Sequence, residues 1–102
     1  MKIAIAGDGK NLESEVSAVA GRARHFLIFE NGELEKVISN PFRIGGGGAS
    51  FAVAAMLADE GVELLVCGHF GEKMVTVLAE KNIAKRELPN LKIAEALRKI
   101  AE

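Results

Sequence analysis

The chain has 102 residues, of which 49% are hydrophobic, so it is long enough for a single domain, residues 1–102, with a modest core. Thirteen Lys and Arg residues against 14 Asp and Glu residues leave a net charge of −1, which excludes a global positive field for nucleic acid or an anionic membrane. A single cysteine excludes an internal disulfide, and no stretch has the pattern of a signal peptide or a membrane span. We therefore expect a cytoplasmic protein.

The chain opens with a predicted strand. Residues 2–6 form a β-rich apolar run that ends in the turn Gly7-Asp8-Gly9. Residues 10–21 are polar and mixed with no firm period, and this pattern favours a loop.

A hairpin follows. Residues 24–30 and 33–39 are predicted strands, and Asn31-Gly32 between them is the dipeptide most typical of a tight hairpin turn. Asn40-Pro41 ends the third strand, because a residue before proline avoids the helical region. The second and third strands are therefore expected to be antiparallel neighbours.

A glycine run leads into the most apolar stretch of the chain. Gly45, Gly46, Gly47 and Gly48 precede a helix predicted to start at Ala49, to be buried, and to end at a Gly61 cap. Glycines before a helix N-terminus let a ligand approach main-chain N–H groups at the positive end of the helix dipole, which favours an anion. The alternative is that the glycines only make a tight turn.

The second half alternates strand and helix. Residues 62–67 are a short apolar strand typical of the middle of a parallel sheet, and Gly68-His69-Phe70-Gly71 opens a helix over 72–81. Residues 83–88 predict a charged edge strand, and a last helix follows Pro89-Asn90.

This order predicts an α/β fold of the ribonuclease H-like, three-layer kind. The expected sheet has five strands in the order 3-2-1-4-5, with the second strand antiparallel and helices on both faces. One edge of that sheet collects the carboxyl ends of the first, third and fourth strands, where open α/β sheets bind ligands. The side chains and glycines expected there are Asp8, Lys10, Arg22, His25, Asn40, Arg43, Gly45 to Gly48, Cys67, Gly68 and His69.

The same residues carry a family resemblance. In order, the chain contains MKIAIA, GRARHFLIFENGE and GGGGASFAVAAMLADEGVELLVCGHFGEKMVTVLAEKNI, and it resembles the dinitrogenase iron-molybdenum cofactor biosynthesis family, the domain of NifX, NafY and the C-terminal part of many NifB proteins. The resemblance covers essentially the whole chain. It implies a small carrier or scaffold that binds an iron-sulfur cluster or an iron-molybdenum cofactor precursor, together with proteins that donate or accept that cofactor. Where the family commonly has His-Phe-Gly before the second strand, this chain has Val19-Ala20-Gly21, so the histidine usually proposed as a cofactor ligand is absent.

Two sets of candidate binding residues follow. His25, Cys67 and His69 combine imidazole with thiolate, which suits soft or borderline metals. Each also has a structural interpretation: Cys67 as a small buried hydrophobe, His25 as a half-buried ring and His69 as a turn residue. The expected cofactor-binding positions are Asp8, Arg22, Arg43, Gly45, Gly46, Gly47, Gly48, Ala49, Gly68 and Gly71.

Enzyme classes find little support. A ribonuclease H-like nuclease needs several converging carboxylates, and only Asp8 is well placed. Nucleotide-binding glycine fingerprints and a nucleophile elbow are missing, and without Trp or Tyr the chain lacks stacking platforms for single-stranded nucleic acid. We therefore expect a non-catalytic carrier of a metallocluster or related anionic ligand, as a monomer or homodimer. The alternative is a ligand-free interaction or assembly module.

Overall fold

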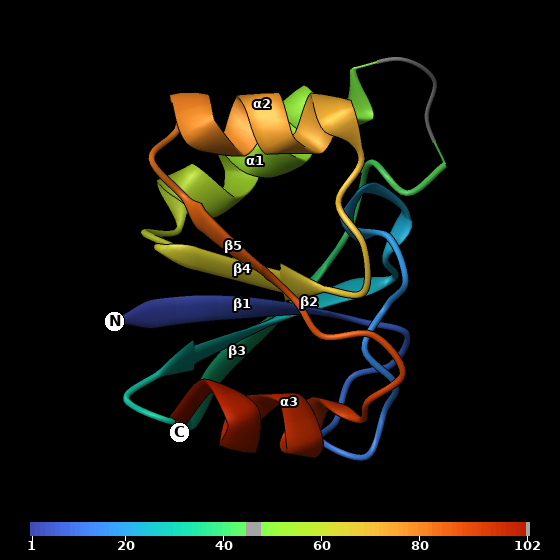
Figure 1. Ribbon diagram of the computed structural model, residues 1–102, viewed down its shortest axis with the longest axis vertical. Helices are drawn as coiled ribbons and strands as arrows, with labels where there is room; N and C mark the ends of the chain where they lie inside the picture. The colour runs from blue at the N-terminus through green and yellow to red at the C-terminus, as the bar shows by residue number, and fades with distance from the viewer. Residues whose placement is uncertain (45–47, 102) are drawn as a thin grey trace.

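The computed structural model describes residues 1–44 and 48–101, in which a five-stranded sheet lies between two layers of helix (Figure 1). The elements in chain order are β1 (Lys2–Gly7), η1 (Ala20–Arg22), β2 (His25–Glu30), β3 (Glu33–Ser39), α1 (Ala49–Asp59), β4 (Leu64–Cys67), α2 (Glu72–Glu80), β5 (Ala84–Glu87) and α3 (Ile93–Ala101). The strand order is β3-β2-β1-β4-β5. β2 is antiparallel to both of its neighbours, whereas β1 with β4 and β4 with β5 are parallel, so the predicted ribonuclease H-like arrangement is confirmed.

The predicted hairpin between β2 and β3 has the expected turn. Asn31 and Gly32 take φ angles of 53° and 82°, the left-handed conformation that a two-residue turn of this type requires at both positions. β2 and β3 pair from Glu30 and Glu33 back to His25 and Ser39, with a shift of register between Ile28 and Phe29. The hairpin therefore returns the chain to the edge of the sheet at which β1 ends.

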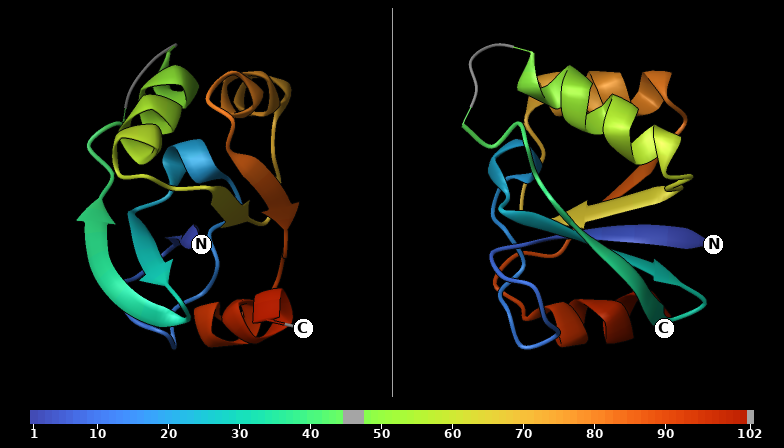
Figure 2. Two further views of the ribbon diagram at one scale, coloured as in Figure 1. Left: turned by 90° about the vertical axis from the view of Figure 1, so that its left-hand side faces the viewer. Right: turned by 180° about the vertical axis from the view of Figure 1, so that it is seen from behind.

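Helices cover both faces of the sheet. In Figure 2, α1 and α2 lie side by side over one face and α3 lies under the other. Because side chains alternate along a strand, Phe26 and Ile28 pack under α1 and α2, whereas Leu27 and Phe29 pack against α3. Among the described residues, no helix has the length and apolar character needed to cross a bilayer.

α1 is less enclosed than its composition suggests. Val53, Ala54 and Leu57 are fully buried, but Phe51 keeps 56% of its surface exposed. The helix ends as predicted at Gly61, whose φ of 80° needs glycine, with its N–H donating to the Ala58 carbonyl at 3.0 Å. The apolar run therefore supplies one buried face and one face open to solvent.

The segment between β1 and β2, expected to be a loop, is held firmly against the sheet. The Ser17 N–H donates to the Ala6 carbonyl, and the Gly68 N–H donates to the Ser17 carbonyl, each at 2.8 Å. A further bridge pairs Val19 with His69 in parallel. These bonds place η1 over the carboxyl ends of β1 and β4, beneath the starts of α1 and α2.

Candidate functional site

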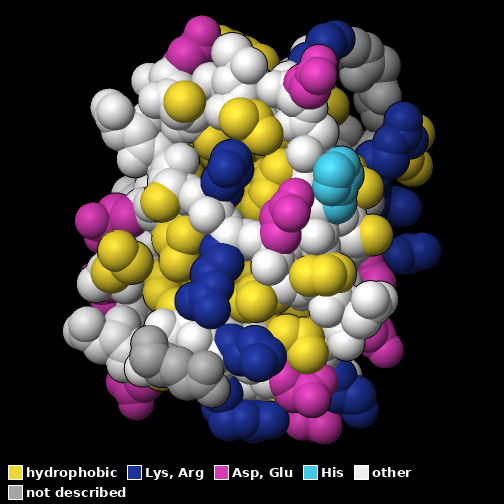
Figure 3. All heavy atoms as spheres, viewed as in Figure 1, with side chains coloured by type: hydrophobic (Ala, Val, Ile, Leu, Met, Phe, Trp, Pro, Cys, Tyr) yellow, Lys and Arg dark blue, Asp and Glu magenta, His cyan; other side chains and the backbone are white. Residues whose placement is uncertain are grey.

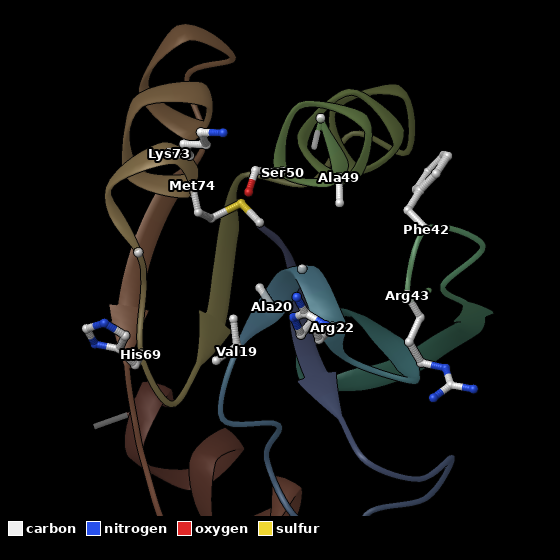
Figure 4. A pocket seen from close by; sticks show the side chains of 13 residues that line it. Val19, Ala20, Arg22, Phe42, Arg43, Ala49, Ser50, His69, Lys73 and Met74 are labelled. Carbon is white, nitrogen blue, oxygen red and sulfur yellow. The ribbon is translucent and has the colours of Figure 1, made fainter. Parts of the chain in front are cut away.

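A cavity of about 470 Å³ opens at the carboxyl edge of the sheet. Its walls come from η1, from the segment after β3 and from the starts of α1 and α2 (Figure 4). The volume is within the range of small-molecule sites, roughly 300–1,000 Å³. The described residues that line it are Val19, Ala20, Gly21, Arg22, Phe42, Arg43, Gly48, Ala49, Ser50, His69, Gly71, Lys73 and Met74.

The charged side chains on this lining are positive. Arg22, Arg43 and Lys73 line the cavity, and its described lining includes no carboxylate. None of these cations forms an ion pair with an acidic side chain in the described ranges. Figure 4 shows Arg22 on η1 in the middle of the view and Lys73 directed from α2 toward α1, whereas the Arg43 guanidinium points away from the helices. Arg22 and Lys73 are therefore the side-chain cations best placed to meet a bound anion.

Both neighbouring helices direct their N-termini toward the cavity. The first helical bond of α1 runs from the Ala52 N–H to the Gly48 carbonyl, and that of α2 from the Val75 N–H to the Gly71 carbonyl, each at 3.0 Å. The preceding N–H groups of each first turn thus have no acceptor within the helix, and neither N-cap residue supplies a side-chain bond. Gly48 reaches this geometry with a φ of 95°. The cavity accordingly combines side-chain cations with the positive ends of helix dipoles.

The predicted cofactor-binding residues divide into those at the cavity and those elsewhere. Arg22, Arg43, Gly48, Ala49 and Gly71 line it. Gly45, Gly46 and Gly47 lie outside the described residues.

Asp8 and Gly68 do not line the cavity. Asp8 is exposed, and its N–H donates to the Glu15 carbonyl at 3.0 Å. Gly68 is buried, and a Cβ there would come within 3.1 Å of the Ala18 backbone, so this glycine lets two chain segments approach closely. Its contribution is to packing of the turn.

His69 is at the margin of the cavity, and its imidazole is directed away from the centre (Figure 4). The Nδ1 atom lies 3.3 Å from Oε2 of Glu87, the last residue of β5, and 72% of the His69 side chain is exposed. The same Glu87 oxygen accepts the Phe70 N–H at 3.0 Å. Glu87 therefore holds the turn between β4 and α2 as well as the imidazole.

Cys67 lies in the core between the sheet and the α1–α2 layer and has no exposed surface. Its Sγ donates to the His69 carbonyl at 3.1 Å. Burial raises the pKa of the Cys67 thiol to about 11, so the thiol is protonated near neutral pH. In this arrangement Cys67 behaves as a small buried hydrophobe.

His25 begins β2 on the opposite face of the sheet from Cys67. It alternates with Leu27 and Phe29, which pack toward α3, whereas Cys67 packs toward α1 and α2. The structure thus does not bring His25, Cys67 and His69 together. Among the described residues, no group of at least three His, Cys, Asp or Glu side chains is close enough to hold a metal ion.

Sequence reasoning did not name seven of the lining residues as site residues: Val19, Ala20, Gly21, Phe42, Ser50, Lys73 and Met74. Lys73 is the second residue of α2, so its place in the first turn of a helix at the binding edge was the available signal. Met74 is apolar and only 4% exposed, and nothing in its helical spacing distinguishes a cavity floor from ordinary core. A Cβ built on Gly21 of η1 would lie 3.9 Å from Cε of Met74, and sequence spacing does not reveal that these two residues are close.

Fold and cavity together define a class: a small α/β protein of ribonuclease H-like fold with a cationic ligand cavity at the carboxyl edge of its sheet. The chain belongs to the dinitrogenase iron-molybdenum cofactor family, whose sequence profile matches residues 1–102. Membership implies a small cofactor-binding or carrier protein associated with biosynthesis of that cofactor. A comparison with curated proteins finds no match.

Solved structures support the same fold. The apo form of the orange protein from Desulfovibrio gigas aligns with a TM-score of 0.91 at 24% identity, over 98% of this chain and 86% of that one. The NMR structure of a candidate NifB protein from Thermotoga aligns with a TM-score of 0.84 at 25% identity, over 98% of this chain and 86% of that one. Both likenesses extend over almost the whole of this chain.

Proposed function

We propose that the protein is a non-catalytic carrier that holds a negatively charged metallocluster, or a precursor of the iron-molybdenum cofactor, in the cavity between η1, α1 and α2. The observation that carries the proposal is the cavity lining, where Arg22 and Lys73 face a space bordered by two helix N-termini and by no described carboxylate. Such an arrangement stabilises negative charge by direct attraction and by N–H donors at once. Family membership makes a cofactor or its precursor the natural cargo.

The donor set favours a preassembled cluster. Iron-sulfur clusters are commonly held by several Cys thiolates, whereas this chain has one cysteine and the pKa of its buried thiol is raised to about 11. The chain therefore fits a cargo that arrives with its own sulfide ligands and is held through charge and N–H donors. Release of such a cargo needs no protein–metal thiolate bond to break.

Binding of sulfate, a simple surrogate anion, tests the cavity directly. In ¹⁵N-labelled protein at low ionic strength, sulfate should shift the amide signals of Gly48, Ala49 and Gly71, and added NaCl should reverse the shifts. Arg22→Gln and Lys73→Gln should each weaken sulfate binding several-fold, because each removes a cavity cation. Lys85→Gln on exposed β5 is the matched control, since Lys85 does not line the cavity.

The cargo itself requires a second experiment. After anaerobic incubation with a preassembled iron-sulfur cluster and removal of unbound cluster, visible absorption and metal analysis should show retained cluster in the wild type and less in Arg22→Gln. Cys67→Ser should retain as much as the wild type. Two results would overturn the proposal in favour of a ligand-free assembly module. One is equal retention of cluster by the wild type and Arg22→Gln. The other is that sulfate leaves the amide signals of the cavity residues unshifted.

A further inference from the structure

A second group of cations lies beyond the cavity, around His25. This residue begins β2 and pairs with Gly7 of β1 and Ser39 of β3. Its Nδ1 atom is buried and has no hydrogen-bond partner among the described residues. A buried imidazole nitrogen without a partner is costly, which makes His25 unusual among the described residues.

Three cations from separate segments are near enough to this imidazole to lower its pKa. Lys10 comes from the loop after β1, Arg24 directly precedes β2, and Arg43 follows β3. Burial lowers the pKa of His25, and the positive charges of Lys10, Arg24 and Arg43 lower it further. Among the described residues, no carboxylate shifts this pKa. The local potential is therefore positive although the whole chain carries a net charge of −1.

The cations of this group are available to a partner. Lys10 and Arg24 are exposed, Arg43 is half-buried, and none of them pairs with a carboxylate in the ranges 1–44 and 48–101. Figure 4 shows the Arg43 guanidinium directed away from the cavity that its stem helps to line. In Figure 3, Lys and Arg side chains lie along the right-hand margin of the molecule, with some Asp and Glu side chains lower on the same margin. We call the surface formed by Lys10, Arg24, His25 and Arg43 the basic surface.

We propose that the basic surface is a docking site for a carboxylate-rich segment of a partner protein. Charge complementarity favours a carboxylate-rich occupant, because the unpaired Lys and Arg groups from separate segments can each meet a carboxylate. Such charged groups mainly set the encounter rate and the orientation of the partner. The group is too small for an extended phosphate backbone, and a chain without Trp or Tyr offers it little base stacking. Arg43 adjoins both the basic surface and the cavity, so a docked partner lies beside the cavity opening. We infer from this position that the partner donates cargo to the cavity or accepts cargo from it, and this inference rests on the proposed function.

A short polyglutamate peptide is the probe, with a Gly-Ser peptide of equal length as the neutral control. At low salt, polyglutamate should shift the NMR signals of the His25 ring and the Arg24 side chain. It should also raise the pKa of His25, because bound carboxylates offset the nearby cations. Arg24→Glu should weaken binding by ~10-fold or more, and added salt should weaken binding to the wild type. Lys85→Glu on β5 should leave the affinity unchanged within error.

Other outcomes identify a different ligand. Equal affinity of the wild type and Arg24→Glu for polyglutamate would overturn the proposal, as would shifts confined to Arg22 and Lys73. Tighter binding of inorganic phosphate, a DNA oligonucleotide or phosphatidylserine vesicles at these same residues would replace the protein partner by that class. The cavity is tested independently, because Arg22→Gln and Lys73→Gln should each weaken sulfate binding at Gly48 several-fold while leaving the polyglutamate affinity intact.

Discussion

Val19 and His69 face each other in a parallel bridge that joins the segment before η1 to the turn between β4 and α2. The His69 N–H donates to the Ala18 carbonyl at 2.7 Å, which fixes the pairing. In sequence, Val19-Ala20-Gly21 stands where the family commonly has His-Phe-Gly, and this chain has His69-Phe70-Gly71 in the neighbouring turn. The two turns are thus adjacent in space, but the imidazole at position 69 is directed to Glu87 and away from the cavity.

Val19→His should restore a metal-binding imidazole at the cavity. Val19 lines the cavity and is 42% exposed, so the substitution should change the free energy of unfolding by only about 0.5 kcal/mol. We expect Val19→His to retain more cluster than the wild type after anaerobic incubation with a preassembled iron-sulfur cluster, measured by visible absorption and metal analysis. Val75→His, at an exposed position of α2, controls for the addition of a histidine elsewhere. An equal gain in both variants would show that position 19 does not face a ligand.

Cys67 should behave as a buried thiol. Because its pKa is raised to about 11, iodoacetamide at pH 8 should alkylate it slowly in the native protein and quickly in denaturant. The unfolded chain loses the thiol proton near the ordinary pKa of 9.0, whereas the folded chain keeps it up to about 11, so this residue's contribution to stability falls as pH rises between these values. Denaturant titrations of the wild type and Cys67→Ala should show a shallower loss in the variant. Rapid alkylation of the native protein would contradict burial.

Much of the fold follows from local patterns. Asn31-Gly32 fixes the hairpin, Gly61 ends α1, and the apolar strand over β4 belongs to the sheet interior, so strand order and direction are predictable. The segment over residues 10–21 was harder, because its order comes from long-range bonds such as Ser17 to Ala6. The local spacing of apolar residues does not predict such long-range hydrogen bonds.

The site was predictable at the level of the edge but not of the individual side chain. Right-handed connections bring Arg22, Gly48 and Gly71 to one end of the sheet. Whether a side chain there faces the cavity depends on strand parity and rotamer. Parity separates His25 from Cys67, and the contact with Glu87 turns His69 outward. The rotamer of Arg43 likewise directs its guanidinium away from the cavity.

Ala54→Asp should test the burial of α1. Ala54 is fully buried against the sheet, so a carboxylate there would lack a partner and should cost several kcal/mol of unfolding free energy, on the order of 3 or more. Ala79→Asp, at an exposed position of α2, is the matched control and should cost far less. Urea denaturation followed by circular dichroism measures both. A near-native midpoint for Ala54→Asp would contradict the packing of α1 on the sheet.

Gly48 separates the conformational role of the glycine run from its role in binding. Its φ of 95° is strained for any L residue, yet a Cβ there would meet no heavy atom of the described residues within 4 Å. The cost of Gly48→Val should therefore come from the backbone, at ~1 to 3 kcal/mol of unfolding free energy. Gly48→Asn should cost less, because Asn tolerates the left-handed region better than other side chains.

Sulfate titration of the two Gly48 variants then gives the second measurement. If Gly48 serves only the turn, both variants should bind sulfate as the wild type does once the fraction of folded protein is taken into account. We expect instead that both bind several-fold more weakly than this correction allows, because a side chain on Gly48 enters the space in front of the α1 N–H groups. If sulfate affinity falls in both variants although their stabilities differ, the loss of affinity comes from the added side chain at the ligand and not from unfolding. Full sulfate affinity in folded Gly48→Val would remove the α1 N-terminus from the binding site.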